Sequence, residues 1–263
     1  IMEGPKVIPV KDPELKNTKH DDIHPHLPQI NGYGGGALIL MLAPVKCGKS
    51  TILSNMLLNK DFYDAQERFD QTVVISNTIA NCITSRFLKQ AFDCYDHYSD
   101  SIIDGIITRQ KSFAKEDQPE IALVLDDCLG SIKINSRVNH LASRYRHFNI
   151  KLLIMNSQKF VGAVSPVVRA NATNVIIGSP FPNIKELAAI CECYGDQYGG
   201  PNKMMALYKS ACQERYDFIH LDLQNTKMYR NFDTLIAEGH NHYIDINKKF
   251  SSPEENIDIE VKQ

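Results

Sequence analysis

Short, mainly apolar runs recur along the middle of the chain and are separated by longer segments of mixed polarity. These runs occupy residues 38–42, 72–76, 121–125, 152–155 and 174–177. Near-continuous apolar runs of this length are typical of strands buried on both faces of a parallel sheet. The segments between them are long enough to hold crossover helices. The pattern therefore predicts an α/β fold with a central, mostly parallel sheet flanked by helices.

The pattern changes beyond residue 180. Apolar positions at helical spacing occupy residues 184–193 and 203–212, and alternation follows over residues 218–223. Alternation is typical of a strand with one face exposed, so we expect an edge strand there.

The N-terminal segment has a different composition. Residues 1–30 carry five prolines and many charges with little periodicity, which favours an extended arm over a folding unit. We therefore expect three parts: an extended arm over 1–35, one domain over 36–250 with C-terminal helical and strand additions, and a disordered acidic tail over 251–263.

The first apolar run ends at a phosphate-binding motif. The stretch APVKCGKS, Ala43–Ser50, fits G-x-x-x-x-G-K-[ST] with alanine at the first position, and apolar residues at helical spacing follow it. The backbone N–H groups of such a loop and the following helix N-terminus bind an anion. The lysine reaches the terminal phosphates and the hydroxyl binds Mg²⁺. The predicted nucleotide-binding residues are Ala43, Pro44, Val45, Lys46, Cys47, Gly48, Lys49, Ser50 and Thr51.

A second run, IALVLDDCLG at residues 121–130, ends in two adjacent carboxylates. At the tip of a strand beside the phosphate loop, Asp126 can hold the Mg²⁺ water shell with Ser50. Asp127 can polarise a water molecule that attacks the γ-phosphate. Because side chains alternate along a strand, both acids can serve one site only if the strand ends there. The pair favours hydrolysis.

Two sets of polar residues flank the apolar run at 152–155 in the sequence, one after it and one before it. Asn156, Ser157 and Gln158 follow it at the expected carboxyl edge of the sheet, where ligands bind in doubly wound sheets. The Gln158 amide can hydrogen-bond the attacking water or the γ-phosphate. Arg144 and Arg146 precede the run, and either guanidinium directed at a neighbouring subunit's γ-phosphate would act as an arginine finger.

Composition limits the class of protein. The 263 residues, 43% hydrophobic, suffice for one large α/β domain. The apolar runs are far shorter than the roughly 20 residues needed to cross a bilayer, and no secretory signal stands at the start. We therefore expect no membrane-spanning segment. The seven cysteines are interpreted as reduced thiols and not as a disulfide framework, which favours an intracellular protein. A formal net charge of −2 gives no overall basic footprint, so any nucleic-acid contact must come from a local patch or from lysines pooled in a ring of subunits.

Taken together, these motifs resemble the FtsK/HerA superfamily of DNA-pumping ATPases. Within it they are most similar to the genome-packaging ATPases of nucleocytoplasmic large DNA viruses and virophages. The resemblance rests on APVKCGKST, VLDDCLG, RYRHFNIKLLIMNSQ and PVVRANATNVIIG, in that order, and covers roughly residues 36–180. It implies a P-loop NTPase of the RecA-like (ASCE) type. Ala43 replaces the usual first glycine of the loop, and Asp127 stands where many relatives have glutamate.

The resemblance also implies roles for individual residues. Lys49, Ser50 and Thr51 would belong to the nucleotide loop, Asp126 would be the metal-site acid, Asp127 the water-activating acid and Gln158 the sensor. Arg146 or Arg144 would be the finger, with Arg169 as a third candidate.

A packaging ATPase implies particular ligands and partners. ATP and Mg²⁺ would be bound, double-stranded DNA would be moved, and five or six copies would form a ring that works in the host cytoplasm, at the virus factory, or in the virion, with capsid vertex proteins as further partners. For the DNA contact we select residues 130–137, which contain Lys133 and Arg137, and next residues 99–115.

Two other classes share the phosphate loop. A small-molecule or nucleoside kinase would carry it, although the chain shows no arginine-rich lid between the strands and the paired acids suit attack by water better. A P-loop nucleotide switch without turnover is the non-enzymatic alternative. Phosphate release in the presence of DNA, as opposed to phosphate transfer to a nucleoside, separates these classes.

Overall fold

The structure is a computed structural model that describes residues 23–30, 35–79, 85–133 and 136–239. Its strands are β1 (Ala37–Leu42), β2 (Gln71–Ser76), β3 (Asp93–Tyr95), β4 (Ile121–Asp126), β5 (Ile150–Ser157), β6 (Asn174–Gly178), β7 (Phe218–Asp222), β8 (Lys227–Arg230) and β9 (Thr234–Glu238). Its α-helices are α1 (Lys49–Leu58), α2 (Ala65–Arg68), α3 (Ser85–Ala91), α4 (Asp100–Lys111), α5 (Arg137–Arg144), α6 (Pro166–Asn171), α7 (Ile184–Tyr194) and α8 (Pro201–Ala211). Short 3₁₀ turns are η1 (Lys115–Asp117), η2 (Leu129–Ser131), η3 (Tyr145–Phe148) and η4 (Gly195–Tyr198).

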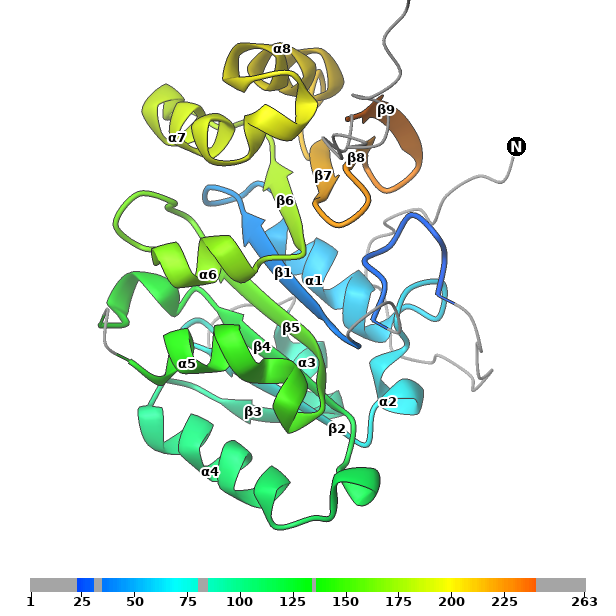
Figure 1. Cartoon of the computed structure of the whole chain (residues 1–263), viewed down its shortest axis with the longest axis vertical. Helices are drawn as coiled ribbons and strands as arrows, with labels where there is room; N and C mark the ends of the chain where they lie inside the picture. The colour runs from blue at the N-terminus through cyan, green and yellow to red at the C-terminus, as the bar shows by residue number, and fades with distance from the viewer. Residues whose placement is uncertain (1–22, 31–34, 80–84, 134–135, 240–263) are drawn as a thin grey trace, which may run out of the picture.

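The described strands form one sheet in the order β3-β2-β4-β5-β1-β6-β7-β8-β9 (Figure 1). The six strands from β3 to β6 run parallel, and β7, β8 and β9 continue the sheet antiparallel. The predicted α/β fold with a mostly parallel sheet is therefore confirmed. β5 lies between β4, the strand that carries the paired acids, and β1.

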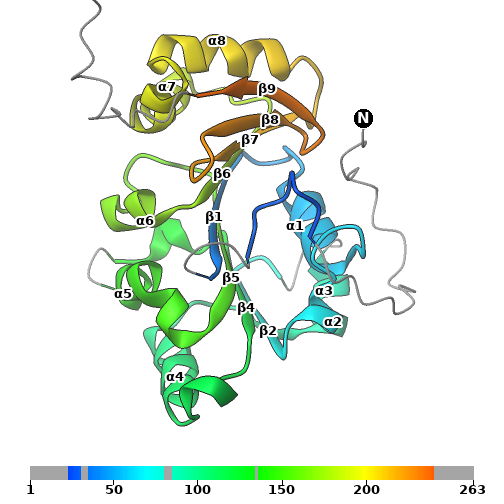
Figure 2. The same ribbon diagram turned by 45° about the vertical axis from the view of Figure 1, so that its right-hand side comes forward.

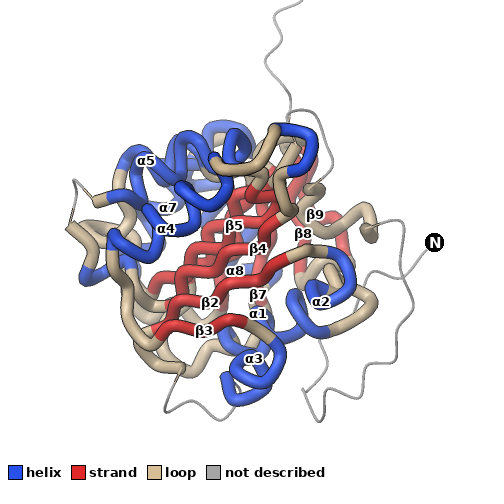
Figure 3. The backbone as a smooth tube through the Cα atoms, turned by 90° about the horizontal axis from the view of Figure 1, so that it is seen from below, coloured by secondary structure: helices blue, strands red, loops and turns tan. Residues whose placement is uncertain are grey.

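Helices cover both faces of the parallel strands, which explains their continuous apolar sequences. In β1, Leu38, Leu40 and Leu42 belong to one core cluster, whereas Ala37, Ile39 and Met41 belong to the other. Figure 2 shows α4, α5 and α6 on one side of the sheet and α1, α2 and α3 on the opposite side. Figure 3 shows the same layers from below, with the strands twisted between them.

The edge strand expected over residues 218–223 is an interior strand, and that prediction is wrong. β7 pairs with β6 on one side and with β8 on the other. Two further strands, β8 and β9, extend the sheet beyond it, and α7 and α8 lie over this end of the molecule (Figure 1). Alternation alone indicated one exposed face but could not show which strands would pair with it.

The described part of the expected N-terminal arm packs against the domain. Leu27 and Ile30 are buried in the core cluster that contains α1, and the Tyr63 hydroxyl donates to the Pro28 carbonyl at 2.7 Å. Residues 1–22 and 31–34 lie outside the described residues, as does the expected acidic tail over 251–263. The three-part division remains a prediction, although residues 23–30 differ from a free arm because their apolar side chains are buried.

Candidate active site

The candidate residues come from strands that end at the same edge of the sheet. β1, β2, β4 and β5 are parallel neighbours in the core, so their carboxyl ends lie side by side. In register, Ser76 lies beside Asp126, and Leu42 lies beside Ser157. The topology therefore gathers the phosphate loop, the paired acids and the Gln158 segment at one edge, as is usual for ligand sites of open α/β sheets.

The segment from Ala43 to Gly48 connects β1 to α1 and places the helix N-terminus at this edge. Gly48 occupies the N-cap with a φ of 84°, and Lys46 has a φ of 61°. These left-handed torsions curl the loop, and glycine adopts them without a steric penalty. Gly48 at the N-cap has no side chain that could cap α1, and the first N–H groups of a helix suit an anion.

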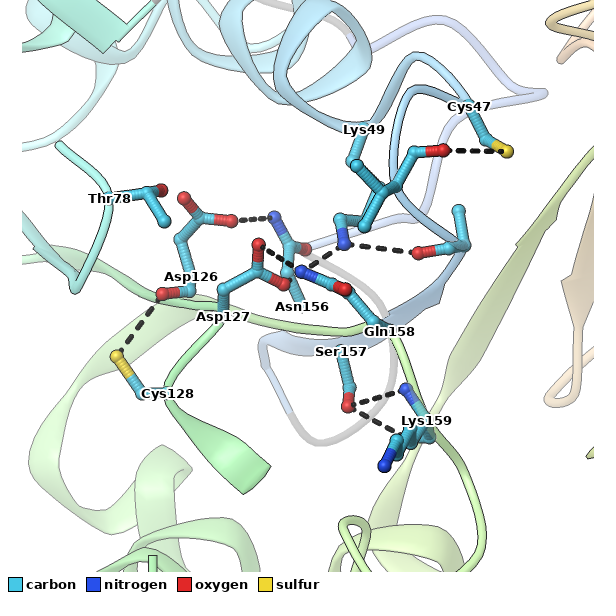
Figure 4. Close-up of polar contacts among 12 residues, drawn as sticks. Cys47, Lys49, Thr78, Asp126, Asp127, Cys128, Asn156, Ser157, Gln158 and Lys159 are labelled. Atoms are coloured by element: carbon cyan, nitrogen blue, oxygen red, sulfur yellow. Dashed lines mark hydrogen bonds and ion pairs between the residues drawn. The ribbon is translucent and has the colours of Figure 1, made fainter. Parts of the chain in front are cut away.

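Lys49, Asp127 and Gln158 form a connected polar chain (Figure 4). The Lys49 ammonium lies 2.9 Å from Asp127 Oδ1 and also donates to the Ala43 carbonyl at 3.0 Å. The Gln158 amide donates to the other carboxylate oxygen, Oδ2, at 3.1 Å. Lys49 and Asp127 are largely buried, whereas Gln158 is exposed. Three residues predicted for catalysis thus meet in space.

A left-handed backbone at Asp127 lets the two adjacent acids face one site. β4 ends at Asp126, and Asp127 has a φ of 51°. The Asn77 amide donates to the Asp127 carbonyl at 3.4 Å, which helps to hold this turn. The expectation that the strand ends between the two acids is met by these torsions.

Asp126 is buried and tightly held. Its Oδ2 accepts from the Ser76 hydroxyl at 2.8 Å, and its Oδ1 accepts from the Asn156 amide at 3.0 Å. Burial raises the pKa of Asp126 above its ordinary value, the negative charge of Asp127 adds to the rise, and the two hydrogen bonds together with Lys49 oppose it. A nearby divalent cation would favour the charged carboxylate. A carboxylate and the Ser50 hydroxyl are the hard oxygen donors that Mg²⁺ accepts, so these residues fit the ion.

The arginine candidates lie elsewhere. Arg144 ends α5, and Arg146 lies in η3, which leads into the amino end of β5. The Arg146 guanidinium donates to the Tyr145 hydroxyl at 3.0 Å, and that hydroxyl donates to the carbonyl of Gly36, just before β1. The eight residues of β5 therefore separate Arg146 from Gln158, a span of roughly 25 Å. The structure does not bring Arg144 or Arg146 to the site of their own chain.

Arg169, the third candidate, is bound within its own chain. Its guanidinium donates to the carbonyls of Val164 and Phe160, both at 2.9 Å, and lies 3.9 Å from the centre of the Phe160 ring. These contacts fasten the loop that follows Gln158. Such a guanidinium would have to break them to act as a finger.

The segment selected for DNA contacts is partly described. Lys133 is exposed, and the Arg137 guanidinium lies 2.9 Å from Asp104 of α4. Residues 134–135 lie outside the described residues. The first and second choices for a DNA contact, 130–137 and 99–115, therefore touch each other through this ion pair.

Several site residues escaped the sequence analysis. Ser76 was assigned only to a strand, although its place at a strand's carboxyl end next to the acidic strand was a usable signal. Gly178, at the end of β6, lies against the phosphate loop: a Cβ added there would lie 2.6 Å from the Ala43 Cβ. Tyr216 lies over Gly48, where a Cβ would be 3.4 Å from its ring. No local pattern predicts these two contacts: Gly178 meets the loop because β6 pairs with β1, and Tyr216 meets it because β7 returns antiparallel to β6.

Within the described residues, no helix is both long and apolar enough to cross a bilayer. No protein-family model matches the chain. Uncharacterized protein 015R of frog virus 3 (isolate Goorha) is 27% identical over 169 residues, which are 62% of this chain and 50% of that protein. The chain therefore matches only about half the length of this relative.

Solved structures resemble the chain more widely. The DNA-packaging ATPase B204 of Sulfolobus turreted icosahedral virus is 14% identical and gives a TM-score of 0.55 over 76% of this chain and 98% of that one. The genome packaging NTPase B204 of Sulfolobus turreted icosahedral virus 2, in complex with AMPPCP, is 15% identical and gives a TM-score of 0.51 over 74% of this chain and 96% of that one. At these identities the likeness establishes the fold. The resemblance predicted from the motifs is confirmed at that level: this chain has the P-loop fold of the viral genome-packaging ATPases.

Proposed function

We propose that the chain is an ATP hydrolase that moves double-stranded DNA into a viral capsid as a ring of subunits. The proposal rests on one observation: the side chains of Lys49, Asp127 and Gln158 are joined by hydrogen bonds beside the phosphate loop. The P-loop fold and the AMPPCP complex of the B204 relative support nucleotide binding, and the packaging function named for that relative supports the role.

Each residue has a distinct task in this proposal. The loop N–H groups and Lys49 bind the phosphates, which compete with Asp127 for the ammonium. Once the Asp127 carboxylate is released from Lys49, it can accept a proton from the attacking water. Gln158 is placed to hold that water or the γ-phosphate, since its amide already lies beside Asp127.

Ser50 and Asp126 would hold Mg²⁺, which neutralises charge that develops on the phosphate oxygens. Ser76 and Asn156 orient the Asp126 carboxylate through hydrogen bonds. Support of this kind from neighbouring side chains fixes the geometry of a metal ligand.

The arginine finger would act between subunits. Arg146 and Arg144 are exposed at the opposite edge of the sheet from their own phosphate loop, so either could reach only a neighbour's nucleotide. A ring of five or six copies would supply such a neighbour. The ring would also repeat each basic loop around one duplex, which would offset the net charge of −2. Lys133 is the more accessible of the two selected DNA-contact residues because Arg137 is already paired with Asp104.

The kinase alternative is less well supported. A small-molecule or nucleoside kinase would carry an arginine-rich lid between the strands, which the sequence lacks, and the Gln158 amide beside Asp127 suits the holding of a water molecule. A non-hydrolysing nucleotide switch would share the phosphate loop but release no phosphate, so turnover measurements separate it from a hydrolase.

The test is steady-state phosphate release with Mg²⁺ and ATP, with and without duplex DNA. We expect Lys49→Ala to abolish turnover and to weaken ATP binding. Asp127→Asn should bind ATP normally but lose turnover by a factor on the order of 10² or more, because an amide cannot accept the proton. Hydrolysis by Asp127→Asn at the wild-type rate would show that this residue does not activate water. Phosphate transfer to a nucleoside, with no release to water, would support the kinase instead.

A further inference from the structure

A short turn after α8 places an arginine and a tyrosine next to the phosphate loop. β7 runs antiparallel to β6, and Phe218 at its start pairs with Gly178 at the end of β6. The segment before β7 therefore lies at the same edge as the carboxyl ends of β1 and β6. Tyr216, in this segment, packs on the phosphate loop at Gly48, where a Cβ would lie 3.4 Å from the tyrosine Cδ1.

The turn holds its aromatic residue in an unfavourable backbone conformation. Tyr216 has a φ of 76°, in the region that favours glycine. The turn spans Glu214 to Asp217: the Asp217 N–H donates to the Glu214 carbonyl at 3.3 Å, and the Glu214 N–H donates to Asp217 Oδ2 at 2.8 Å. Glycine would relieve the strain, so the tyrosine side chain itself is the feature that needs a reason.

Buried contacts keep the turn in place. Asp217 is 6% exposed, and its carboxylate accepts from Asn231 at 2.9 Å and from Arg230 at 3.2 Å. The tip above this anchor is open to solvent: Tyr216 is 52% exposed. A rigid base that carries a half-exposed aromatic ring is suited to contact a flat ligand.

The neighbouring Arg215 makes the tip cationic. Its guanidinium lies 4.9 Å from the centre of the Tyr216 ring. The charge of Arg215, with that of Lys49, also opposes the burial that raises the pKa of Cys47 in the phosphate loop. Arg215 therefore lies close enough to the loop for its charge to act there.

We propose that the Arg215–Tyr216 tip forms the base-side wall of the nucleotide site, with the Tyr216 ring stacking on the nucleobase. This inference rests on the proposed nucleotide site and extends it to the part of the ligand that the phosphate loop does not bind. Stacking uses the face of any base, so the tip favours purines by contact area and does not select adenine over guanine. A preference for adenine would need groups other than this ring.

The test compares nucleotides with inorganic tripolyphosphate, which has phosphates but no base. Dissociation constants for ATP, GTP and tripolyphosphate would be measured by calorimetry on the full chain with EDTA in place of Mg²⁺, so that no nucleotide is hydrolysed during the titration. In Tyr216→Gly we expect ATP and GTP to bind roughly 10-fold more weakly and tripolyphosphate to bind unchanged. Tyr216→Phe should behave as wild type, because the ring is kept. Tyr95→Ala, which removes an exposed aromatic side chain from the far edge strand β3, is the matched control and should change nothing.

The thermal midpoint separates binding from folding. Because glycine accepts a φ of 76°, Tyr216→Gly should melt no lower than wild type, so a loss of affinity would not come from unfolding. The inference is overturned if Tyr216→Gly binds ATP as tightly as wild type, or if it loses ATP and tripolyphosphate equally. If the wild-type chain binds neither ligand, the nucleotide site itself is refuted. If the wild-type chain binds ATP and tripolyphosphate and Tyr216→Gly does not change either affinity, the nucleotide site stands and only the base-side wall is refuted.

Discussion

Asp127 shows how one backbone torsion decides what a residue can do. Had the strand continued, its side chain would have pointed to the face opposite Asp126. At a φ of 51° it instead lies 2.9 Å from Lys49. Cys128, the next residue, donates its thiol to the Ile75 carbonyl at 3.4 Å and ties the segment after the turn to the neighbouring strand. The chemistry of the site thus depends on a local departure from regular strand geometry.

His220 gives a prediction at the same scale. It lies in β7, 1% exposed, with its imidazole Nε2 at 2.9 Å from the Asn174 amide and its ring stacked on Tyr229. Burial lowers the pKa of His220 to about 4, against the opposing charge of Asp222. Between its ordinary value of 6.5 and about 4, the unfolded chain binds a proton that the folded chain does not. The free energy of unfolding therefore falls as the pH drops through this window.

As the pH falls from 7 to 5, we expect the titration of His220 to lower the free energy of unfolding by roughly 2 kcal/mol. Urea denaturation of wild type and of His220→Gln at both pH values measures this contribution as a difference. The variant starts less stable, because glutamine does not fill the same space, but its stability should depend less on pH. Equal pH dependence in the two proteins would mean that His220 does not titrate as its burial implies.

At the scale of elements, the end of β6 and the start of the phosphate loop form a close contact. A Cβ at Gly178 would lie 2.6 Å from the Ala43 Cβ, and no flexible side chain can yield there. We expect Gly178→Ala to separate the strand from the loop, to cost about 1–3 kcal/mol in stability and to weaken ATP binding. Thermal melting and ATP titration measure the two effects. Gly105→Ala in α4 is the control, because its Cβ meets nothing within 4 Å and alanine favours a helix.

The same contact provides a compensating change. Ala43→Gly removes the methyl group that Gly178→Ala would strike and restores the usual first glycine of the motif. The double variant should therefore regain most of the stability and affinity lost by Gly178→Ala alone. If it does not, the close approach at residue 178 is not the cause of the loss.

At the scale of the whole molecule, the proposed ring of subunits gives a prediction, because Arg146 lies at the sheet edge opposite the phosphate loop of its own chain. We expect Arg146→Ala chains to inhibit wild-type chains when the two are mixed, because each variant leaves a neighbour's nucleotide without its finger. Phosphate release, plotted against the fraction of variant, should fall below the straight line for simple dilution. Arg68→Ala, which removes an arginine that hydrogen-bonds the Tyr63 carbonyl within its own chain, is the control and should follow the line. A linear loss with Arg146→Ala would argue against contact between subunits at this residue.

Local sequence was sufficient to predict the parallel core and most of the polar chain at its edge. Five apolar runs predicted the parallel strands β1, β2, β4, β5 and β6, because strands buried on both faces consist almost entirely of apolar residues. The phosphate-loop motif and the paired acids then located Lys49 and Asp127 at strand ends, where parallel strands must bring them together. The same rule predicted the position of Gln158, which follows the carboxyl end of β5.

The remaining features depended on contacts between distant segments. The antiparallel addition of β7, β8 and β9 turned an expected edge strand into an interior one, because pairing partners are not encoded in a strand's own alternation. Only that return places Tyr216 beside Gly48, although the two residues are far apart in the chain. Sequence by itself therefore determined which residues could do chemistry and at which edge of the sheet. The tertiary structure decided which of them meet, because hydrogen bonds and close packing depend on distances that no local pattern specifies.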